Sequence, residues 1–500
     1  MAGPERPAAR KANVVDVTAS GAAARADTRP GLAEVLVAFA CFAVLCVAAL
    51  SRPVKLLEPD DYAYRASIVA LTEGHILLTD AQYRELAARL RQEDAATGLG
   101  GSRGISQWTQ LGDGHWVSEK NPGYPFLAAP FAAAGLSRAA PLVFAALGCL
   151  ALFTGGRRWL GPWGGAWAVG LFCSSGAALT FAWRVWMPTF TGAALVAAGA
   201  GALLWATLAG DADPRRRTWV GLLGFVAVEA AMVVRYTDVV ALVVATAAVL
   251  AAWRFAPGCL PRRALAWWLG SAALAVALVL AWNAVVYGGA TTTGYAAGVV
   301  TFGWGAVRGN LENLPRHLVT TMPASLLAVV ALIWLVVRSL RLRRTAPGTA
   351  ARPSRAAAHR DLAVAAALAA VWLGVWGLYF TYYWTARDGG GPGGGGPGSG
   401  GPFGPGGLPG PAGPPGLAGG DQAVHLVRFF VPALAPIALL GAWVLVRLPR
   451  WLSLAAVAGF VGLGSWSVAD MASADARGGI MGGMPRGPGG LPGEPQGPQP

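Results

Sequence analysis

The sequence predicts an all-α membrane protein that crosses the bilayer about eleven times. Of its 500 residues 55% are hydrophobic and only 13% are charged, and the mean hydropathy is +0.48. Apolar runs of roughly 20 residues recur along the chain, which is the length that a helix needs to cross ~30 Å of hydrocarbon. The predicted spans are 33–50, 139–154, 163–181, 188–209, 218–234, 239–255, 264–286, 319–338, 361–384, 428–446 and 451–468.

The first apolar run follows a polar, Ala/Arg-rich stretch of about 30 residues that is too long and too mixed for the start of a signal peptide. We therefore expect 33–50 to be a retained helix and 1–32 to be a disordered cytoplasmic tail. The five cysteines all lie in or beside apolar runs without ligand-like spacing, so neither a disulfide framework nor a zinc site is predicted.

The basic residues predict how the chain is threaded through the membrane. The net charge is +14, but the arginines gather in short loops between apolar runs, which indicates membrane topology and not nucleic-acid binding. A further short run, 123–137, decides the topology. If it lies along the membrane surface, the arginine clusters and the N-terminal tail share one side, as positive residues do on the cytoplasmic side. The N-terminus is then inside, and the loop 51–138 and the C-terminus are outside.

Three outer loops result from this topology. The loop 51–138 contains two stretches with amphipathic spacing, Asp61–Leu71 and Ala81–Leu90, which are typical of helices at the interface. The second outer loop is 287–318. The third, 385–427, is almost pure Gly and Pro, and its collagen-like period is too short for a triple helix, so we expect disorder there and in the tail 469–500.

The segment Glu58-Pro59-Asp60-Asp61-Tyr62-Ala63-Tyr64 is the strongest candidate for chemistry. Two adjacent carboxylates at the mouth of a membrane repel each other and resist desolvation. They fit a general base or a cation ligand that faces a polar cavity. They fit equally well a solvated helix cap, since Pro followed by acids is typical of a helix start. An enzyme on the outer face needs a donor that arrives activated, such as a lipid phosphate. Its site then needs a base for the acceptor proton and cations for the leaving phosphate.

The ordered set of motifs resembles the C-type membrane glycosyltransferases, including protein mannosyltransferases and aminoarabinose transferases and their actinobacterial relatives. The resemblance covers about residues 33–440. Its pieces are the segment at Glu58, Glu119-Lys120-Asn121-Pro122-Gly123-Tyr124-Pro125, Arg184-Val185-Trp186-Met187-Pro188 and Arg428-Phe429-Phe430-Val431-Pro432. The resemblance implies an outer active site in a bacterial plasma membrane, with Asp60 or Asp61 as the catalytic base. It also implies a polyprenyl-phosphate sugar as donor and a protein, lipid or glycan acceptor, with no nucleic acid involved.

Cations at the outer boundary are expected to hold the donor phosphate, namely Lys120, Arg184, Arg235 and Arg428. The predicted substrate cavity adds Glu58, Tyr62, Tyr64, Asn121, Tyr124, Glu229, Asp238 and His317. A divalent cation is compatible with two acids, but nothing fixes one, and Met187-Pro188-Thr189 lacks the additional acid that some relatives carry there.

Several of these residues also have simpler interpretations. Arg184 lies between Trp183 and Trp186, where an arginine often only reaches toward the interface. Arg235 and Asp238 are three residues apart and fit a simple pair. Lys120 fits a membrane anchor.

The expected reaction is a direct displacement by a base-activated acceptor, which inverts the anomeric centre. The rival to a glycosyltransferase is a transporter or lipid flippase that uses Glu229, Arg235 and Asp238, and a third alternative is a scaffold whose Gly/Pro loops bind partners.

Overall fold

The computed structural model describes residues 29–99, 104–255, 260, 262–295, 300–344, 352–386 and 426–476. The protein is an all-α polytopic membrane protein. Nine helices in these ranges are long and apolar enough to cross a membrane. They are α2 (Leu32–Leu50), α6 (Ala139–Leu160), α9 (Pro188–Leu208), α10 (Pro214–Val234), α11 (Val239–Phe255), α12 (Arg262–Tyr287), α14 (Ala324–Arg344), α15 (Arg352–Phe380) and α19 (Arg450–Ala476). Two shorter apolar helices, α7 (Gly164–Cys173) and α18 (Leu434–Leu445), lie within the two remaining predicted spans, and neither reaches the length of a membrane span. The all-α polytopic fold class is confirmed, with nine long apolar helices in the described residues where about eleven were predicted.

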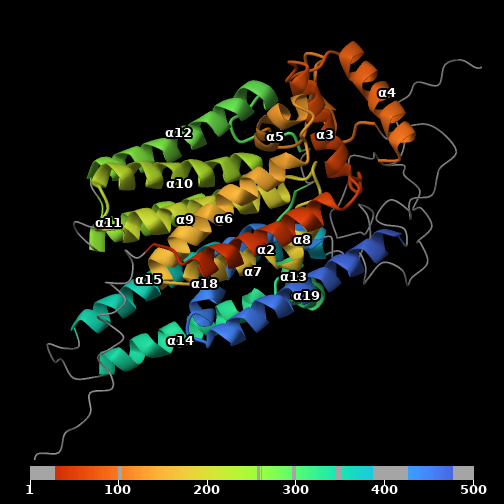
Figure 1. Ribbon diagram of the computed structural model, residues 1–500. Coiled ribbons are helices and arrows are strands. Elements are labelled where there is room, and N and C mark those ends of the chain that lie inside the picture. The colour runs from red at the N-terminus through yellow and green to blue at the C-terminus, as the bar shows by residue number, and fades with distance from the viewer. Residues whose placement is uncertain are drawn as a thin grey trace, which may run out of the picture.

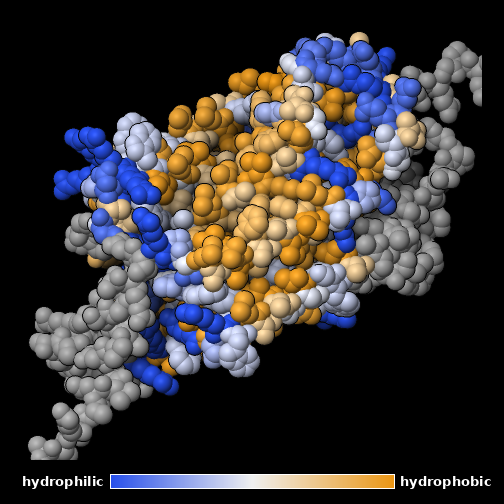
Figure 2. Space-filling model, in the orientation of Figure 1, coloured by the Kyte–Doolittle hydropathy of each residue, from blue (hydrophilic) through white to orange (hydrophobic). Residues whose placement is uncertain are grey.

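The long helices run roughly side by side, and the elements of the loop 51–138 gather at one end of the array (Figure 1). These elements are α3 (Pro59–Thr72), α4 (Asp80–Thr97), β1 (Trp108–Gln110), β2 (Trp116–Ser118) and α5 (Gly123–Ala133). A band of apolar surface separates this polar end from a second polar end (Figure 2). The second end holds the arginines at the close of α6 and the start of α10. Loop 51–138 and these arginines therefore lie at opposite ends, as the charge pattern requires.

Small residues let the central helices approach closely. A Cβ at Gly155 of α6 would lie 2.2 Å from the Gly201 carbonyl oxygen of α9, so only glycine fits at this crossing. Close backbone approach of this kind is how helices gain packing energy in lipid. Helix α7 is buried along its whole length, and α18 is buried along nearly all of its length, which places both helices inside the array. The outer elements therefore rest on a densely packed interior.

Helices α3 and α4 form a small outer unit with its own apolar core. Leu86 and Leu90 of α4 pack with Ala66 and Ala70 of α3 and with Trp108 of β1. Thr79 and Gln82 form a capping box at the start of α4, and Gly98 ends the helix in the left-handed conformation. Both predicted amphipathic stretches are thus helical.

Several predicted boundaries are wrong, each for a local reason. The span 163–181 breaks at Ser174, because the Ser175 hydroxyl accepts the Ala178 N–H and starts a separate helix, α8 (Gly176–Phe181). The span 319–338 begins at Ala324, because Pro323 separates it from α13 (Gly305–Thr321). The span 428–446 opens as two 3₁₀ turns, η3 (Val427–Phe429) and η4 (Val431–Ala433).

Helices α19 and α5 bear on two further predictions, the start of the C-terminal tail and the placement of 123–137. Helix α19 continues to Ala476, so the start of the predicted disordered tail at 469 is wrong. Helix α5 has 11 residues, which is about 16 Å at 1.5 Å per residue and too short to cross the bilayer. The predicted disorder of 1–28, 387–425 and 477–500 lies outside the described residues, as does Cys259.

Candidate functional site

The start of α3 is built by the acidic segment itself. Glu58 is the N-cap, Pro59 takes the first helical position, and Asp61 completes a capping box. One Asp61 carboxylate oxygen accepts the backbone N–H groups of Leu57 at 2.9 Å and Glu58 at 3.0 Å. Asp61 therefore caps the helix as one interpretation predicted, but the cap is buried and not solvated.

Arg184 comes from a distant part of the sequence and pairs with both capping acids, Glu58 and Asp61. Its guanidinium donates to Glu58 at 2.7 Å and to Asp61 at 2.5 Å, and the Arg184 and Asp61 side chains are each 1% exposed. Burial raises the pKa of Asp61, while the charge of Arg184 works in the opposite direction. Arg184 is thus an internal counterion, and whether it also binds a phosphate stays a prediction.

Asp60 differs from its neighbours because its side chain is 21% exposed. One of its oxygens lies 2.8 Å from the Lys120 ammonium, and the other lies 3.7 Å from the guanidinium of Arg428. Arg428 also pairs with Glu58. Three carboxylates from α3 therefore meet three cations that come from distant parts of the chain, and Asp60 is the carboxylate nearest to solvent.

Tyr295 completes the surroundings of Lys120. The ammonium donates to the Tyr295 hydroxyl at 3.1 Å and lies 4.8 Å from the centre of the tyrosine ring. Burial lowers the pKa of Lys120, but the nearby charge of Asp60 and the hydrogen bonds to Asp60 and Tyr295 outweigh it, so the pKa is raised above the usual 10.5. Lys120 is therefore a fixed positive charge at the site.

A second polar cluster, centred on Arg235, contacts Arg428 of the first. Arg235, at the C-terminal end of α10, donates to the Arg428 carbonyl oxygen at 3.1 Å and to the Tyr379 hydroxyl at 2.8 Å. The aromatic ring of Phe429 lies 4.7 Å from the guanidinium of Arg428 and 5.9 Å from that of Arg235. Asp238 is fully buried close by, and neither of its carboxylate oxygens accepts a hydrogen bond from a described residue. Arg235 therefore positions the backbone of Arg428 through the hydrogen bond to its carbonyl oxygen.

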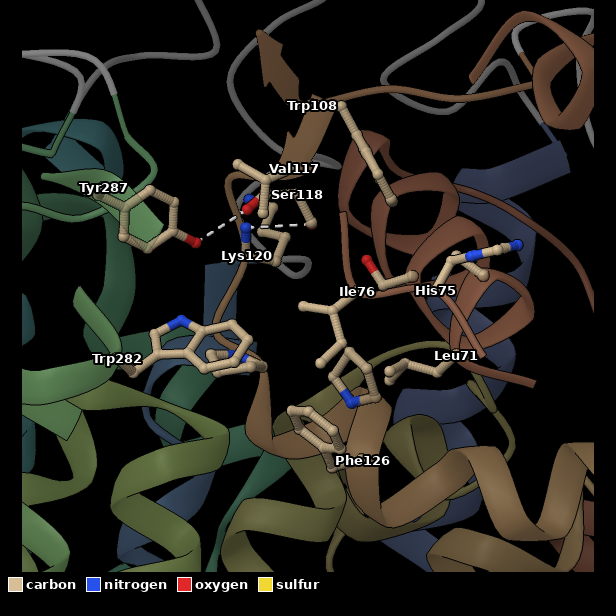
Figure 3. A pocket seen from close by; sticks show the side chains of 14 residues that line it. Leu71, His75, Ile76, Trp108, Val117, Ser118, Lys120, Phe126, Trp282 and Tyr287 are labelled. Atoms are coloured by element: carbon tan, nitrogen blue, oxygen red, sulfur yellow. Dashed lines mark hydrogen bonds between the residues drawn. The ribbon is translucent and has the colours of Figure 1, made fainter. Parts of the chain in front are cut away.

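A narrow crevice is lined in part by Lys120 (Figure 3). Because Lys120 pairs with Asp60, the crevice borders the acidic cluster, which we define as Glu58, Asp60 and Asp61. Its own cavity volume is small, roughly 30 Å³, which is about the space of one water molecule. Figure 3 shows Phe126 and Trp282 along its lower edge and Tyr287 beside Lys120, with Ile76 and Trp108 opposite. Tyr287 donates to the Ser118 carbonyl oxygen at 3.0 Å and so ties the end of α12 to the β-ribbon. The crevice thus runs from the aromatic side chains of Phe126 and Trp282 to Lys120.

The remaining predicted site residues fall into two groups. Tyr64 and Tyr124 pack edge to face at 5.8 Å, and Tyr124 donates to the Val185 carbonyl oxygen. Tyr62 is buried in α3, the helix that also carries Tyr64. Asn121 donates to the Val234 carbonyl oxygen at 3.4 Å. These four residues pack around the cluster. Glu229 does not, because it lies inside α10 and accepts from Ser271 of α12 at 2.8 Å. His317 lies on α13, near its C-terminal end.

The carboxylates of the cluster face basic groups. The structure shows no set of three His, Cys, Asp or Glu side chains suited to a metal in the described ranges. Glu58, Asp60 and Asp61 are the residues that could offer oxygen ligands, and each of them already pairs with a guanidinium or an ammonium group.

Two aromatic residues of the site, Tyr295 and Tyr379, were not predicted from the sequence. Tyr295 hydrogen-bonds to Lys120 across 175 positions of sequence, and Tyr379 to Arg235 across 144. The only signal for Tyr379 in the sequence is a run of aromatic residues at the end of the span 361–384, which equally fits an interface belt.

No protein-family model, no curated protein and no solved structure matches this chain. The function is therefore inferred from the geometry of the site.

Proposed function

We propose that this protein is a membrane glycosyltransferase that moves a sugar from a polyprenyl-phosphate donor to an acceptor hydroxyl or amine outside the cell. The supporting observation is the position of Asp60, the one carboxylate of the cluster that is both partly exposed and in contact with two cations. A carboxylate that can reach an acceptor and cations that can hold a leaving phosphate are the two requirements of the reaction.

The phosphate of the donor binds between Lys120 and Arg428. In the structure both cations neutralise Asp60, at 2.8 Å and 3.7 Å. The donor is a phosphodiester with one negative charge, and its phosphate gains a second charge as the bond to the sugar breaks, so both cations bind the leaving phosphate more strongly than they bind a carboxylate. As the cations turn toward the phosphate, Asp60 loses its counterions and becomes a better proton acceptor. Donor binding thereby prepares the base.

Asp60 then takes the proton from the acceptor hydroxyl or amine while the acceptor attacks the anomeric carbon. The bond between this carbon and the phosphate oxygen breaks, its electrons pass to that oxygen, and polyprenyl phosphate leaves against Lys120 and Arg428. One direct displacement inverts the anomeric configuration. Glu58, Asp61 and Arg184 hold the start of α3 in place, and Arg235 holds Arg428, so all four are positioning residues.

The donor reaches the site from the bilayer, along the aromatic lower edge of the crevice formed by Phe126 and Trp282. In a multi-pass protein of a bacterial plasma membrane whose loop 51–138 lies outside, the site can receive a donor that stays in the lipid. The acceptor is a protein, a lipid or a glycan.

The test is sugar transfer in liposomes that contain the full-length protein. We would supply radiolabelled polyprenyl-phosphate mannose, arabinose and glucose, with a membrane extract as acceptor, and determine the anomeric configuration of the product. The proposal predicts transfer from one donor class with inversion. A product of retained configuration would contradict the mechanism. Transfer at the same rate by wild type and by the double variant Lys120→Met/Arg428→Met would contradict the assigned phosphate site.

A further inference from the structure

A groove lies on the membrane-facing side of the protein, between α2 and α6. Phe42, Cys46 and Leu50 line one wall, and Leu142 and Ala146 line the other. The three α2 residues are four apart and the two α6 residues are also four apart, so each set shares one helix face. The groove contains roughly 1130 Å³ of space, including its open side. It lies within the apolar part of the protein, because both helices are candidate membrane spans.

The turn between α5 and α6 closes the groove at the end of the array that carries the acidic cluster. Arg138 lies in this turn, and its guanidinium donates to the Leu50 carbonyl oxygen at 3.0 Å, which bridges the two helices across the top of the groove. Leu50 is the last residue of α2, directly before the chain leads into α3. Arg138 therefore stands at the depth where α2 leaves the membrane.

Arg138 has spare hydrogen-bonding capacity and no anionic partner in the described ranges. A guanidinium carries five N–H donors, and the structure gives Arg138 the single bond to Leu50. None of the residues that line the groove is acidic. An exposed, uncompensated guanidinium directly above an apolar groove is complementary to a molecule with a negative head and a hydrocarbon tail.

The dimensions suit a lipid of the leaflet at this end. The distance along α6 from Arg138 to Ala146 is about 12 Å at roughly 1.5 Å per residue. This is most of the ~15 Å hydrocarbon depth of one leaflet. An acyl chain that follows Leu142 and Ala146 would stay against the groove while its headgroup phosphate remains at Arg138.

We propose that this groove binds an anionic glycerophospholipid of the bilayer, whose phosphate pairs with Arg138. The proposal does not depend on the glycosyltransferase reaction. It gives the protein a lipid site next to the junction of α2 and α3, so the bound lipid braces the segment that leads into the acidic cluster.

The experiment measures which lipids the full-length protein retains. Protein reconstituted with equal amounts of phosphatidylglycerol, phosphatidylcholine and a polyprenyl phosphate is extracted gently, and bound lipid is quantified by native mass spectrometry. We expect wild type to retain phosphatidylglycerol preferentially. Arg138→Gln should lower that preference about fivefold, in line with one surface charge acting on an anionic lipid, and Arg138→Lys should keep most of it.

Two further variants complete the design. Arg316→Gln removes an exposed arginine from α13, outside the groove, and should leave the preference unchanged. Ala146→Trp fills the groove and should reduce retention of the phospholipid with Arg138 intact. Equal retention of the two phospholipids by wild type would overturn the proposal, as would equal losses in Arg138→Gln and Arg316→Gln. Retention of the polyprenyl phosphate that falls in both Arg138→Gln and Ala146→Trp would assign the groove to that ligand and would also overturn the proposal, because polyprenyl phosphate held between Lys120 and Arg428 should not respond to these two variants.

Discussion

The Lys120 ammonium lies 2.8 Å from the carboxylate of Asp60, although the two residues are 60 positions apart in sequence. Lys120 follows the β-ribbon, and Asp60 lies in the first turn of α3. The neighbouring Asp61 makes its ion pair with Arg184 instead. Two adjacent acids thus have different partners, and the difference separates a structural carboxylate from one that is available for chemistry.

We expect Arg184→Met to destabilise the protein by roughly 3–5 kcal/mol, because it leaves the carboxylate of Asp61 buried without its counterion. The matched control is Arg308→Met, which removes an exposed i,i+4 pair with Glu312 and should cost no more than about 0.5 kcal/mol. Unfolding in detergent monitored by tryptophan fluorescence measures both. Equal effects of the two substitutions would show that the buried network contributes little.

The ion pair of Arg65 should hold α4 against α3. Arg65 donates to Glu93 at 2.7 Å and also pairs with Asp94, which is fully buried. We expect Arg65→Met to increase amide hydrogen exchange across α4 at least tenfold while the membrane spans stay protected, because it leaves a buried carboxylate unpaired. Arg89→Met breaks an exposed pair with Glu73 between the same helices and should leave the exchange of α4 nearly unchanged.

The stability that Lys120 contributes should persist into alkaline solution. A cation whose pKa is higher in the folded state stabilises fully below its unfolded pKa, and this stability is lost as pH rises through the folded pKa. The pKa of Lys120 is raised above the usual 10.5. The difference in melting temperature between wild type and Lys120→Met should therefore stay constant from about pH 7 to about pH 10. A difference that already shrinks below about pH 9 would contradict the raised pKa.

Glu229→Gln distinguishes the glycosyltransferase from the transporter. The Glu229 carboxylate accepts a hydrogen bond from Ser271, and a glutamine carbonyl oxygen can accept the same bond, so the fold should be retained. Because Glu229 lies inside α10 and away from the acidic cluster, we expect sugar transfer to stay within about twofold of wild type. A transporter that carries substrate past Glu229 would lose substrate movement in the same variant, which a liposome flux assay would detect.

The sequence predicted the spans because hydrophobic length is a local property. It also predicted the start of α3, since a Pro after an acid followed by two more acids is a local capping signal. The breaks at Ser175 and Pro323 were missed because an apolar run can hide a side-chain cap or a helix stop. Composition alone therefore locates the apolar segments but not the ends of the helices that form in them.

The candidate site was only partly accessible from sequence. Asp60, Lys120 and Arg428 were singled out one by one, and the structure brings them together. Their pairing could not be predicted, because it joins α3, the end of the β-ribbon and η3 through tertiary packing. The division of roles between Asp60 and Asp61 depends on burial, and neighbouring residues of the same type give no sequence signal for it.

The most direct test of the proposed function compares Asp60→Asn with Asp61→Asn in sugar transfer under single-turnover conditions, after each variant is shown to be folded. Asp60→Asn should remove the base and slow transfer by the folded protein at least about 100-fold, and it should also lower the melting temperature, because it leaves the buried ammonium of Lys120 without its carboxylate. Asp61→Asn should lower the melting temperature and, in the folded fraction, slow transfer far less. Normal transfer by folded Asp60→Asn would contradict the role of Asp60 as the base and with it the proposed mechanism.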